Sequence, residues 1–346
     1  MSLPPDTVYA LDFSPWKRES VRQCFADCRV KFVSHRGSVP ANATVLVWGM
    51  RDLSEGFAAG VHVVRLEDGF LRSVGLGADL IRPMSWVVDR AGLYYDARRP
   101  SDLEMLLENN SFSADLLARA RALRERVVRL RITKYNVGTQ TWAVPETIKR
   151  SSKSLILVPG QVETDAALAF GAPGIHHNMA LLEAVRKANP DAYIVYKPHP
   201  DVTAGLRAAG KNEQTASCWC DEVVVDVPME TLLDAVHEVH VMTSLAGFEA
   251  LLRGKAVTCY GQPFYAGWGL TIDMIPIERR SQRLQLDQLV AGALLVYPIY
   301  MRRSTGKKCS AEEALDELEV WKSSQGKTPL WRKAFRVMLR KIVGVR

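Results

Sequence analysis

The sequence predicts an α/β protein with two Rossmann-like domains that face each other across a cleft, followed by C-terminal helices. Three observations support this. The chain has 346 residues, which is longer than an ordinary domain with a single hydrophobic core. Short apolar runs alternate with helical segments before residue 100 and again after residue 154. Polar, glycine-rich segments follow the expected strands, as at the ligand-binding edge of a parallel sheet.

The first domain is expected over residues 1–150. Strands are predicted at 8–11, 44–48 and 61–66, with a helix at 16–26 and a hairpin formed by 86–89 and 93–95. Ser101 is predicted to cap a helix, with Glu104 completing a capping box. A second helix is predicted at about 114–130, and the polar, turn-rich residues 131–153 form the domain junction.

The second domain is expected over residues 151–305. Strands are predicted at 155–158, 192–197, 222–226, 239–242 and 256–260, and helices at 179–189 and 244–253. Alternating strands and helices indicate a parallel, doubly wound sheet. Residues 306–346 are expected to be a helical segment that ends in a basic amphipathic tail.

Composition excludes several classes of protein. No apolar run is long enough for a membrane span and no signal peptide is recognisable, so a cytoplasmic location is expected. The six cysteines contain no C-x-x-C pair, which indicates reduced thiols and no metal site. Residues 321–346 hold eight of the 45 Lys and Arg and none of the 38 Asp and Glu. The rest of the chain is nearly neutral, which argues against binding to nucleic acid.

Chemically active side chains gather after the predicted strands. Residues 159–165 offer Gln161, Glu163 and Asp165, and a carboxylate there could serve as nucleophile, base, ribose ligand or first-turn helix residue. His199 lies between two prolines directly after a strand, which favours a functional role, and Lys197 beside it suits a phosphate.

Two further segments complete the predicted site. Thr243 or Ser244 is a natural helix N-cap, and the N-terminus of that helix could bind phosphate while Glu249 reaches a ribose. Glu67, Asp68 and Arg72 follow a first-domain strand and suit activation of an acceptor. The aromatic segment 261–269 either stacks on a ligand or is a packed loop.

The sequence lacks the motifs that mark several other classes of enzyme. It contains no P-loop, no G-x-S-x-G elbow and no D-x-D pair, so a donor held by a metal-clamped diphosphate is disfavoured and no metal or other cofactor is expected.

Seven segments in order resemble bacterial capsule polysaccharide β-Kdo transferases over about residues 8–315. They are LEDGFLRSVGLG (66–77), VVDRAGLYYDARRPSDLE (87–104), KYN (134–136), VPGQVETDAAL (158–168), VYKPHPD (195–201), TSLAGFEALLRGKAVTCYGQPFYAGWGL (243–270) and LDQLVAGALLVYP (286–298). The resemblance implies a GT-B fold, CMP-Kdo as donor, and retaining transfer by double displacement. The implied acceptor is a lysophosphatidylglycerol-linked, Kdo-terminated oligosaccharide.

The resemblance also implies roles for individual residues. Asp165 matches the nucleophile, Glu67 the acid/base, and His199, Ser244 and Glu249 positions that hold CMP. Further donor contacts are implied for Lys134, Asn136, Gln161, Lys197 and Gln262. The well-known capsule enzymes carry two such modules and this chain carries one, so the linkage that it makes stays open.

The last residues suggest a partner surface. Apolar residues from Trp331 to Val343 recur at helical spacing, with Lys and Arg on the other face. This helix could dock on the anionic inner membrane, near a lipid-linked acceptor and capsule assembly proteins, or pack back on the first domain.

Two other functions stay open: a sialyl-type CMP-sugar transferase, and a non-catalytic nucleotide-binding adaptor of capsule export.

Overall fold

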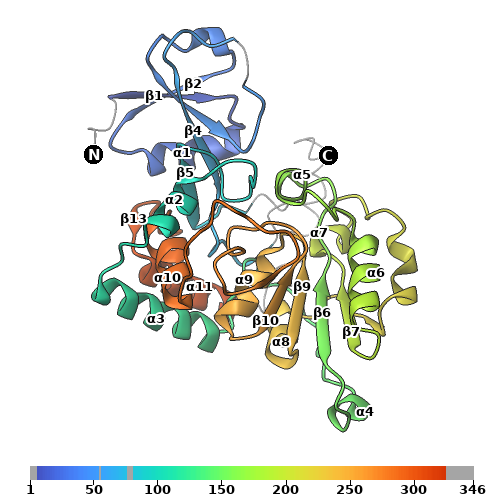
Figure 1. Cartoon of the computed structure of the whole chain (residues 1–346). Helices are drawn as coiled ribbons and strands as arrows, with labels where there is room; N and C mark the ends of the chain where they lie inside the picture. Colours follow the sequence, from blue (N-terminus) through green and yellow to red (C-terminus); the bar gives the residue numbers. More distant parts are fainter. Residues whose placement is uncertain (1–5, 54–55, 76–80, 325–346) are drawn as a thin grey trace.

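The computed structural model describes residues 6–53, 56–75 and 81–324, arranged as two β-sheets with helices around them (Figure 1). The first sheet has the strand order β13-β12-β5-β4-β3-β1-β2, and the second has the order β11-β10-β9-β6-β7-β8. The strands of the first sheet are β1 (Thr7–Leu11), β2 (Arg29–Val33), β3 (Thr44–Trp48), β4 (His62–Asp68), β5 (Ser85–Asp89), β12 (Pro298–Met301) and β13 (Lys308–Cys309). Those of the second are β6 (Leu155–Pro159), β7 (Tyr193–Lys197), β8 (Glu222–Val223), β9 (Glu238–Val241), β10 (Ala256–Cys259) and β11 (Ile272–Asp273).

The second sheet matches the sequence prediction closely. All five of its strand pairings are parallel. The predicted strands at 155–158, 192–197, 239–242 and 256–260 are present within about one residue at each end, whereas the strand predicted at 222–226 is shortened to β8. Parallel pairing brings the carboxyl ends of β6, β7 and β9 to one edge, which is where the polar segments begin.

The first sheet contains both parallel and antiparallel strand pairs. Strands β2, β1, β3 and β4 are parallel, while β4–β5, β5–β12 and β12–β13 are antiparallel. The predicted hairpin between 86–89 and 93–95 is wrong, because β5 pairs with β4 and β12 instead. The carboxylate of Asp89 accepts hydrogen bonds from the amides of Ala91 and Gly92, which turns the chain away from the sheet.

The chain returns to the first sheet near its end. Strand β12 pairs with β5, although residues 298–305 were predicted to belong to the second domain. Helix α11 (Ala311–Ser324) follows and packs near α3 and β12. The segment after residue 298 therefore adds two strands and a helix to the first half of the molecule.

The helices cover the sheets and join the two halves. The helical segments other than α11 are α1 (Pro15–Cys24), η1 (Arg36–Ser38), α2 (Asp102–Asn109), α3 (Ala114–Arg129), α4 (Glu146–Lys149), α5 (Ala166–Gly171), α6 (Asn178–Ala188), α7 (Pro200–Thr203), η3 (Glu213–Cys218), α8 (Met229–Ala235), α9 (Leu245–Leu252), α10 (Leu286–Val290) and η4 (Ala291–Val296), of which η4 is a π-helix. Helix α3 packs against α10 and η4, so a first-half helix contacts the last helices of the second half.

Aromatic packing forms part of the core between the halves. Phe70, which follows β4, stacks on Phe264 of the second half with ring centroids 4.5 Å apart, and Phe248 of α9 lies 5.2 Å from Phe264. All three rings are buried. Burying large aromatic surfaces here holds the ends of the two sheets together.

Glu104 adds a buried ionic link. The Ser101 hydroxyl accepts a hydrogen bond from the Glu104 amide over 3.1 Å, as predicted. The Glu104 carboxylate does not complete the capping box, because it binds the guanidinium groups of Arg279 and Arg280 instead. The Glu104 side chain therefore forms long-range ion pairs in place of the predicted capping-box hydrogen bond.

The predicted amphipathic tail (Trp331–Val343) lies outside the described residues. Across residues 6–53, 56–75 and 81–324, none of the helices combines the length and apolar character that crossing a membrane requires.

Candidate functional site

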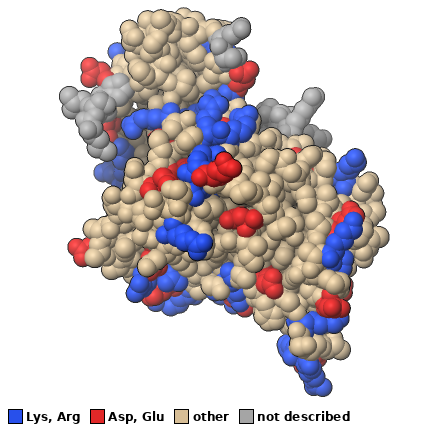
Figure 2. Space-filling model, viewed as in Figure 1, with Lys and Arg blue, Asp and Glu red and all other residues tan. Residues whose placement is uncertain are grey.

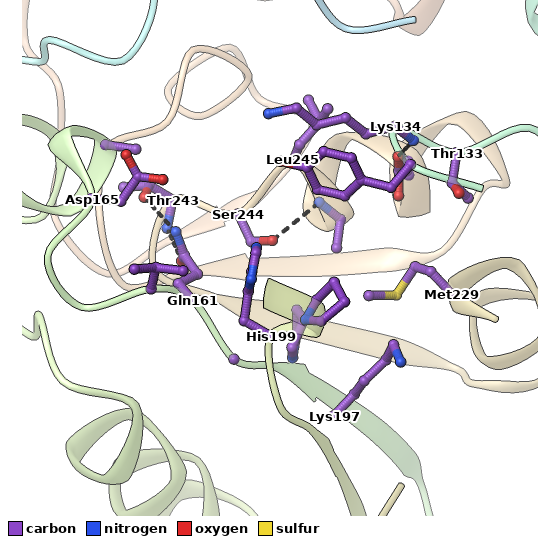
Figure 3. Close-up of a pocket in the computed structure, with 18 of the residues that line it drawn as sticks. Thr133, Lys134, Gln161, Asp165, Lys197, His199, Met229, Thr243, Ser244 and Leu245 are labelled. Atoms are coloured by element: carbon purple, nitrogen blue, oxygen red, sulfur yellow. Dashed lines mark hydrogen bonds between the residues drawn. The ribbon is translucent and has the colours of Figure 1, made fainter. Parts of the chain in front are cut away.

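A cavity lies where the carboxyl ends of β6, β7 and β9 meet the first half of the chain. Its walls come from the segments after these strands, from the residues 133–137, from Tyr94 and Tyr95, and from the segment around Phe264. In Figure 3, Asp165 lies at the opposite end of the cavity from Lys197 and Met229, with Ser244 and His199 between them.

Most of the predicted site residues line this cavity. Those that do are Lys134, Asn136, Gln161, Asp165, Lys197, His199, Thr243, Ser244 and Glu249. The parallel sheet explains this convergence, because strands far apart in sequence end at the same edge.

Gln161 positions the segments after β6 and β9. Its side-chain amide donates to the Thr243 hydroxyl over 3.0 Å, and its carbonyl oxygen accepts from the Thr243 amide over 2.9 Å. The neighbouring Gly160 lies close to β7, since a Cβ there would lie 2.6 Å from the Tyr196 hydroxyl. The Gln161 side chain thus has a structural role in addition to its place in the cavity wall.

Asp165 is an exposed carboxylate at the cavity wall. It occupies the N-cap position of α5, but its side chain makes no capping hydrogen bond. No hydrogen bond or ion pair joins its carboxylate to another side chain or backbone group in the part of the chain that the structure describes. A carboxylate without such partners remains available to react with, or bind, a ligand.

His199 is neutral and oriented by the backbone. It caps α7, where its Nδ1 accepts a hydrogen bond from the Asp201 amide over 3.1 Å. Burial, together with the charges of Lys134, Arg207 and Lys197, lowers the pKa of His199 to about 4. Because Nδ1 is an acceptor in the neutral ring, Nε2 carries the proton and can donate a hydrogen bond to a ligand.

Lys197 is a buried cation in the cavity wall. Lys197 is only 7% exposed, and within the described ranges its ammonium group has no hydrogen-bond or ion-pair partner. Burial lowers its pKa, while the charges of Asp226 and Glu230 oppose that effect. A buried cation without a protein partner favours an anionic ligand.

Helix α9 begins at the cavity. Ser244 is its N-cap, and its hydroxyl accepts a hydrogen bond from the Ala246 amide over 3.3 Å, as predicted. Ser244, Leu245 and Ala246 all line the cavity, so the positive end of the helix dipole faces it.

Glu249 lies on the same helix and is buried. Its Oε1 accepts a hydrogen bond from the Lys134 amide over 2.7 Å. Burial raises the pKa of Glu249 to about 7, with Arg253 acting in the opposite direction. A carboxyl group that is partly protonated at neutral pH can bind a nucleotide without strongly repelling its phosphate.

The segment 134–136 connects the two halves at the cavity. Asn136, with a φ of 50°, donates from its side-chain amide to the Ser73 carbonyl over 3.0 Å. The Tyr135 ring packs edge-on against His199 with centroids 6.3 Å apart. This segment therefore holds first-half residues against the residues that follow β7 and β9.

Glu67 lies behind Tyr95 and is not among the lining residues. The Tyr95 hydroxyl, which belongs to a lining residue, donates to Glu67 Oε2 over 3.2 Å, and the Asp68 amide donates to Oε1 over 3.0 Å. Burial and the charge of Asp68 raise the pKa of Glu67 to about 7. Such a pKa suits a group that exchanges protons at neutral pH.

Two predicted contacts lie elsewhere. Arg72 is buried and pairs with Asp68 at 2.5 Å, and it also donates to the Ser73 hydroxyl. The Gln262 side chain donates to the Pro276 carbonyl over 2.9 Å. Neither residue lines the cavity, because Asp68 engages Arg72 and the Pro276 carbonyl engages Gln262.

Several lining residues were not predicted. Tyr94 and Tyr95 were assigned to a hairpin, and Tyr135 and Met229 were not singled out. The adjacent tyrosines in the resembling segment 87–104 were the one available signal. In the aromatic segment 261–269, Phe264 lines the cavity while Tyr265 and Trp268 are fully buried, so most of that segment is a packed loop.

The grouping of possible metal ligands and the state of the cysteines complete the description of the site. Across the described ranges, no three or more His, Cys, Asp or Glu side chains are grouped as metal ligands would be. All six cysteines are free thiols, as predicted.

Comparison with known proteins identifies the family. Residues 45–305 match the family model described as capsule polysaccharide biosynthesis protein. The chain belongs to this family. The capsule polysaccharide modification protein LipA of Neisseria meningitidis serogroup A is 43% identical over 97% of the chain. The lipopolysaccharide-processing protein LpsZ of Rhizobium meliloti is 38% identical over 89% of the chain. The chain spans about half the length of LipA, 49%, and 73% of LpsZ.

Two solved structures share the fold. Both come from Thermosulfurimonas dismutans KpsC, one described as a β-Kdo 2,7 transferase and the other as a β-Kdo 2,4 transferase. Each has a TM-score of 0.75 and covers 90% of this chain, and this chain covers 98% and 97% of them, respectively. Sequence identity is 41% to the first and 32% to the second. The expected resemblance is confirmed, and the chain has a KpsC-like α/β fold.

Proposed function

We propose that the chain is a retaining β-Kdo transferase of GT-B architecture that moves Kdo from CMP-Kdo to a Kdo-terminated, lipid-linked acceptor in capsule biosynthesis. The structural similarity to two Kdo transferases supports Kdo as the sugar that is transferred. The observation that carries the mechanism is the exposed carboxylate of Asp165, in a cavity whose opposite end holds the buried cation Lys197.

The donor would bind with its phosphate near Lys197, His199 and the start of α9. Lys197 supplies positive charge, the Nε2–H of His199 donates a hydrogen bond, and the amides at the N-terminus of α9 favour an anion. CMP leaves as a monophosphate, and these groups stabilise its charge without a metal clamp. The partly neutral Glu249 lies on the same wall, where it suits the nucleoside.

The first displacement forms a covalent intermediate. An oxygen of Asp165 attacks the anomeric carbon of Kdo, the bond to the CMP phosphate breaks, and its electron pair leaves with CMP. In the second displacement an acceptor hydroxyl attacks the same carbon. Its proton passes to the Glu67 carboxylate as the bond to Asp165 breaks. Two inversions retain the configuration of the sugar.

The test is transfer from CMP-Kdo to a synthetic β-Kdo acceptor, with the product analysed by NMR. The proposal expects a β-linked product, and the greater identity to the 2,7 transferase favours that linkage over 2,4. An α-linked product would contradict the retaining course. Turnover of CMP-sialic acid in place of CMP-Kdo would identify a sialyl-type enzyme. CMP binding without any turnover would support the adaptor function.

The basic tail is proposed to bring the enzyme to its acceptor at the anionic inner membrane, where capsule assembly proteins could also be found. Sedimentation with anionic liposomes should be stronger for the full chain than for a chain ending at Gly326. Equal binding of the two would contradict this role of the tail.

A further inference from the structure

Four cationic side chains gather beyond Glu67, and we call Lys17, Arg51, Arg65 and Arg99 the basic rim. They come from α1, from the segment after β3, from β4 and from the segment after β5. Figure 2 shows Lys and Arg side chains gathered, with acidic ones among them, where the N-terminal lobe meets the rest of the molecule. Figure 1 shows α1, β4 and β5, the elements that carry or precede Lys17, Arg65 and Arg99, at the base of this lobe.

Only half of the basic rim is neutralised by ion pairs. Arg51 pairs with Asp12 at 2.5 Å, and Arg99 pairs with Asp96 at 3.3 Å. Asp96 is also shared with Arg98, at 2.8 Å, so this carboxylate does not neutralise both guanidinium groups.

Arg65 carries an uncompensated charge. Its guanidinium donates to the Gly49 carbonyl over 2.8 Å and to the Arg51 carbonyl over 3.3 Å, and within the described ranges no carboxylate lies at ion-pair distance from it. Burial and the charge of Arg99 lower the pKa of Arg65, while the charges of Asp96 and Asp89 oppose that effect. Like charges held together favour an anionic ligand.

Lys17 carries the second uncompensated charge. Its ammonium lies 3.0 Å from the centre of the Trp48 ring, and it has no ion-pair partner in the part of the chain that the structure describes. The nearby carboxylate of Asp68 is already bound to Arg72. Burial lowers the pKa of Lys17 to about 8, while Asp68 and Glu67 oppose this effect, so the ammonium stays mainly charged at neutral pH.

Glu67 adjoins both the cavity wall and the basic rim. Its Oε2 accepts the hydrogen bond of Tyr95, which lines the cavity. It also lies near Gly49, the residue whose carbonyl binds Arg65: a Cβ on Gly49 would be 3.7 Å from Glu67 Oε2 and 3.7 Å from the Tyr95 hydroxyl. No member of the basic rim lines the cavity. A donor in the cavity would therefore leave the basic rim free for the second substrate.

We propose that the basic rim, with Lys17 as one of its two cations that lack an ion-pair partner in the described ranges, is an anion subsite that binds the carboxylate of the acceptor sugar whose hydroxyl meets Glu67. This inference rests on the proposed function and names how its acceptor is selected. A carboxylate on the acceptor sugar would compensate the charge left on Lys17 and Arg65. It would also fix the orientation of the ring, so that one hydroxyl is presented to Glu67.

The acceptor lipid offers a second anion, its phosphate. We assign the subsite to the sugar carboxylate because the basic rim adjoins Glu67, and the sugar that reacts at Glu67 must lie there. The phosphate is separated from the reacting sugar by the rest of the oligosaccharide. Lysophosphatidylglycerol without sugar therefore distinguishes the two sources.

The test measures binding by isothermal titration calorimetry, with a synthetic β-Kdo disaccharide and with the same disaccharide whose carboxylates are converted to carboxamides. The wild-type chain should bind the carboxylate form about tenfold more tightly. Lys17→Gln should remove this preference by weakening the carboxylate form about tenfold, with the carboxamide unchanged. Lys17→Arg should restore most of the preference.

Lys31→Gln is the matched control. Lys31 lies 5.5 Å from the Tyr9 ring but on β2, at the far edge of the same sheet from β13, so its loss should leave binding of both sugars unchanged. Thermal unfolding of each variant checks its fold. The proposal is overturned if wild-type protein binds both sugars equally, or if Lys17→Gln weakens both equally. It is also overturned if lysophosphatidylglycerol alone competes as well as the disaccharide does.

This binding test does not depend on turnover. A chain that shows the carboxylate preference but fails to transfer Kdo would retain the anion subsite and contradict the proposed function. A chain that transfers Kdo with equal KM for both sugars would retain the proposed function and contradict the subsite.

Discussion

The hydroxyl of Tyr95 donates a hydrogen bond to Oε2 of Glu67 over 3.2 Å. Tyr95 lines the cavity proposed for the donor, and Glu67 is the carboxyl proposed to take the acceptor proton. This one hydrogen bond therefore joins the two substrate sites. Burial and the adjacent carboxyl hold the pKa of Tyr95 above its usual range, so its hydroxyl stays protonated and acts as the donor.

Replacing Tyr95 should change the pH dependence of transfer. The reaction needs Glu67 ionised, so the rate should rise with pH through about 7. The Tyr95 hydroxyl stabilises the ionised form, and Tyr95→Phe should therefore move this rise about one pH unit higher. The variant should be several-fold slower at pH 7 and near wild type at pH 9. Tyr94→Phe is the control, because the Tyr94 hydroxyl only approaches the Asp68 carbonyl, at 3.5 Å. An unchanged profile in Tyr95→Phe would exclude this role for the hydrogen bond.

His199 should act in donor binding as a neutral hydrogen-bond donor. Its pKa of about 4 means that no step near pH 6.5 should belong to it. His199→Asn keeps an acceptor for the Asp201 amide but removes the Nε2–H group, whereas His199→Ala removes both. Both variants should weaken CMP binding about tenfold in calorimetry, and only His199→Ala should also lower thermal stability. Unchanged CMP affinity in His199→Asn would contradict the role of Nε2.

Glu249 should make stability depend on pH. Its pKa in the folded chain is about 7, against the ordinary 4.5, so the folded state holds the proton more tightly than the unfolded state does. The stability that this proton supplies is present below pH 4.5 and is lost as pH rises to 7. The amide in Glu249→Gln does not titrate, so this variant does not lose that stability as pH rises. In urea unfolding, the free energy of unfolding of the variant, relative to wild type, should therefore increase by about 2–3 kcal/mol between pH 5 and pH 8.

A control for Glu249 is available on α6. Glu183→Gln removes a partly exposed carboxylate that pairs with Lys187, and its stability relative to wild type should change by less than about 1 kcal/mol over the same pH range. A constant difference for Glu249→Gln as well would show that Glu249 is ionised at the same pH in the folded and unfolded chains.

The link between Glu104 and Arg280 should stabilise the contact between the halves. Arg280 is 7% exposed and also donates to the carbonyls of Pro263 and Ala266, beside the cavity residue Phe264. Glu104→Gln leaves this buried cation without its carboxylate, and we expect a loss of about 3–5 kcal/mol in unfolding free energy. Glu108→Gln should cost less than about 1 kcal/mol, because Glu108 binds Ser281 at the exposed edge of the same contact. Similar losses for the two variants would contradict the ionic link.

Much of the second sheet and its site followed from local sequence signals. Parallel strands must end at one edge, so the segments carrying Asp165, His199 and Ser244 could be brought together without a structure. Ser244 and Ser101 could be assigned as helix caps because capping is a local interaction.

The unpredicted features depend on contacts between distant residues. Strand β12 joins β5 across more than 200 residues of chain, and no local pattern specifies that partner. Arg72 and Gln262 resembled ligand contacts in sequence, yet Asp68 and the Pro276 carbonyl engage them in the fold. Lys197 and Glu249, in contrast, reach the cavity as predicted, but their perturbed pKa values arise from burial that the sequence does not reveal.

The central claim is that Asp165 forms the bond to the sugar. Intact-protein and peptide mass spectrometry after incubation with CMP-Kdo, without acceptor, tests it most directly. The account predicts a mass increase of one Kdo residue, located on the peptide that contains Asp165. The adduct should be lost in Asp165→Ala and discharged when acceptor is added. Efficient transfer by Asp165→Ala, or an adduct on another residue, would contradict it.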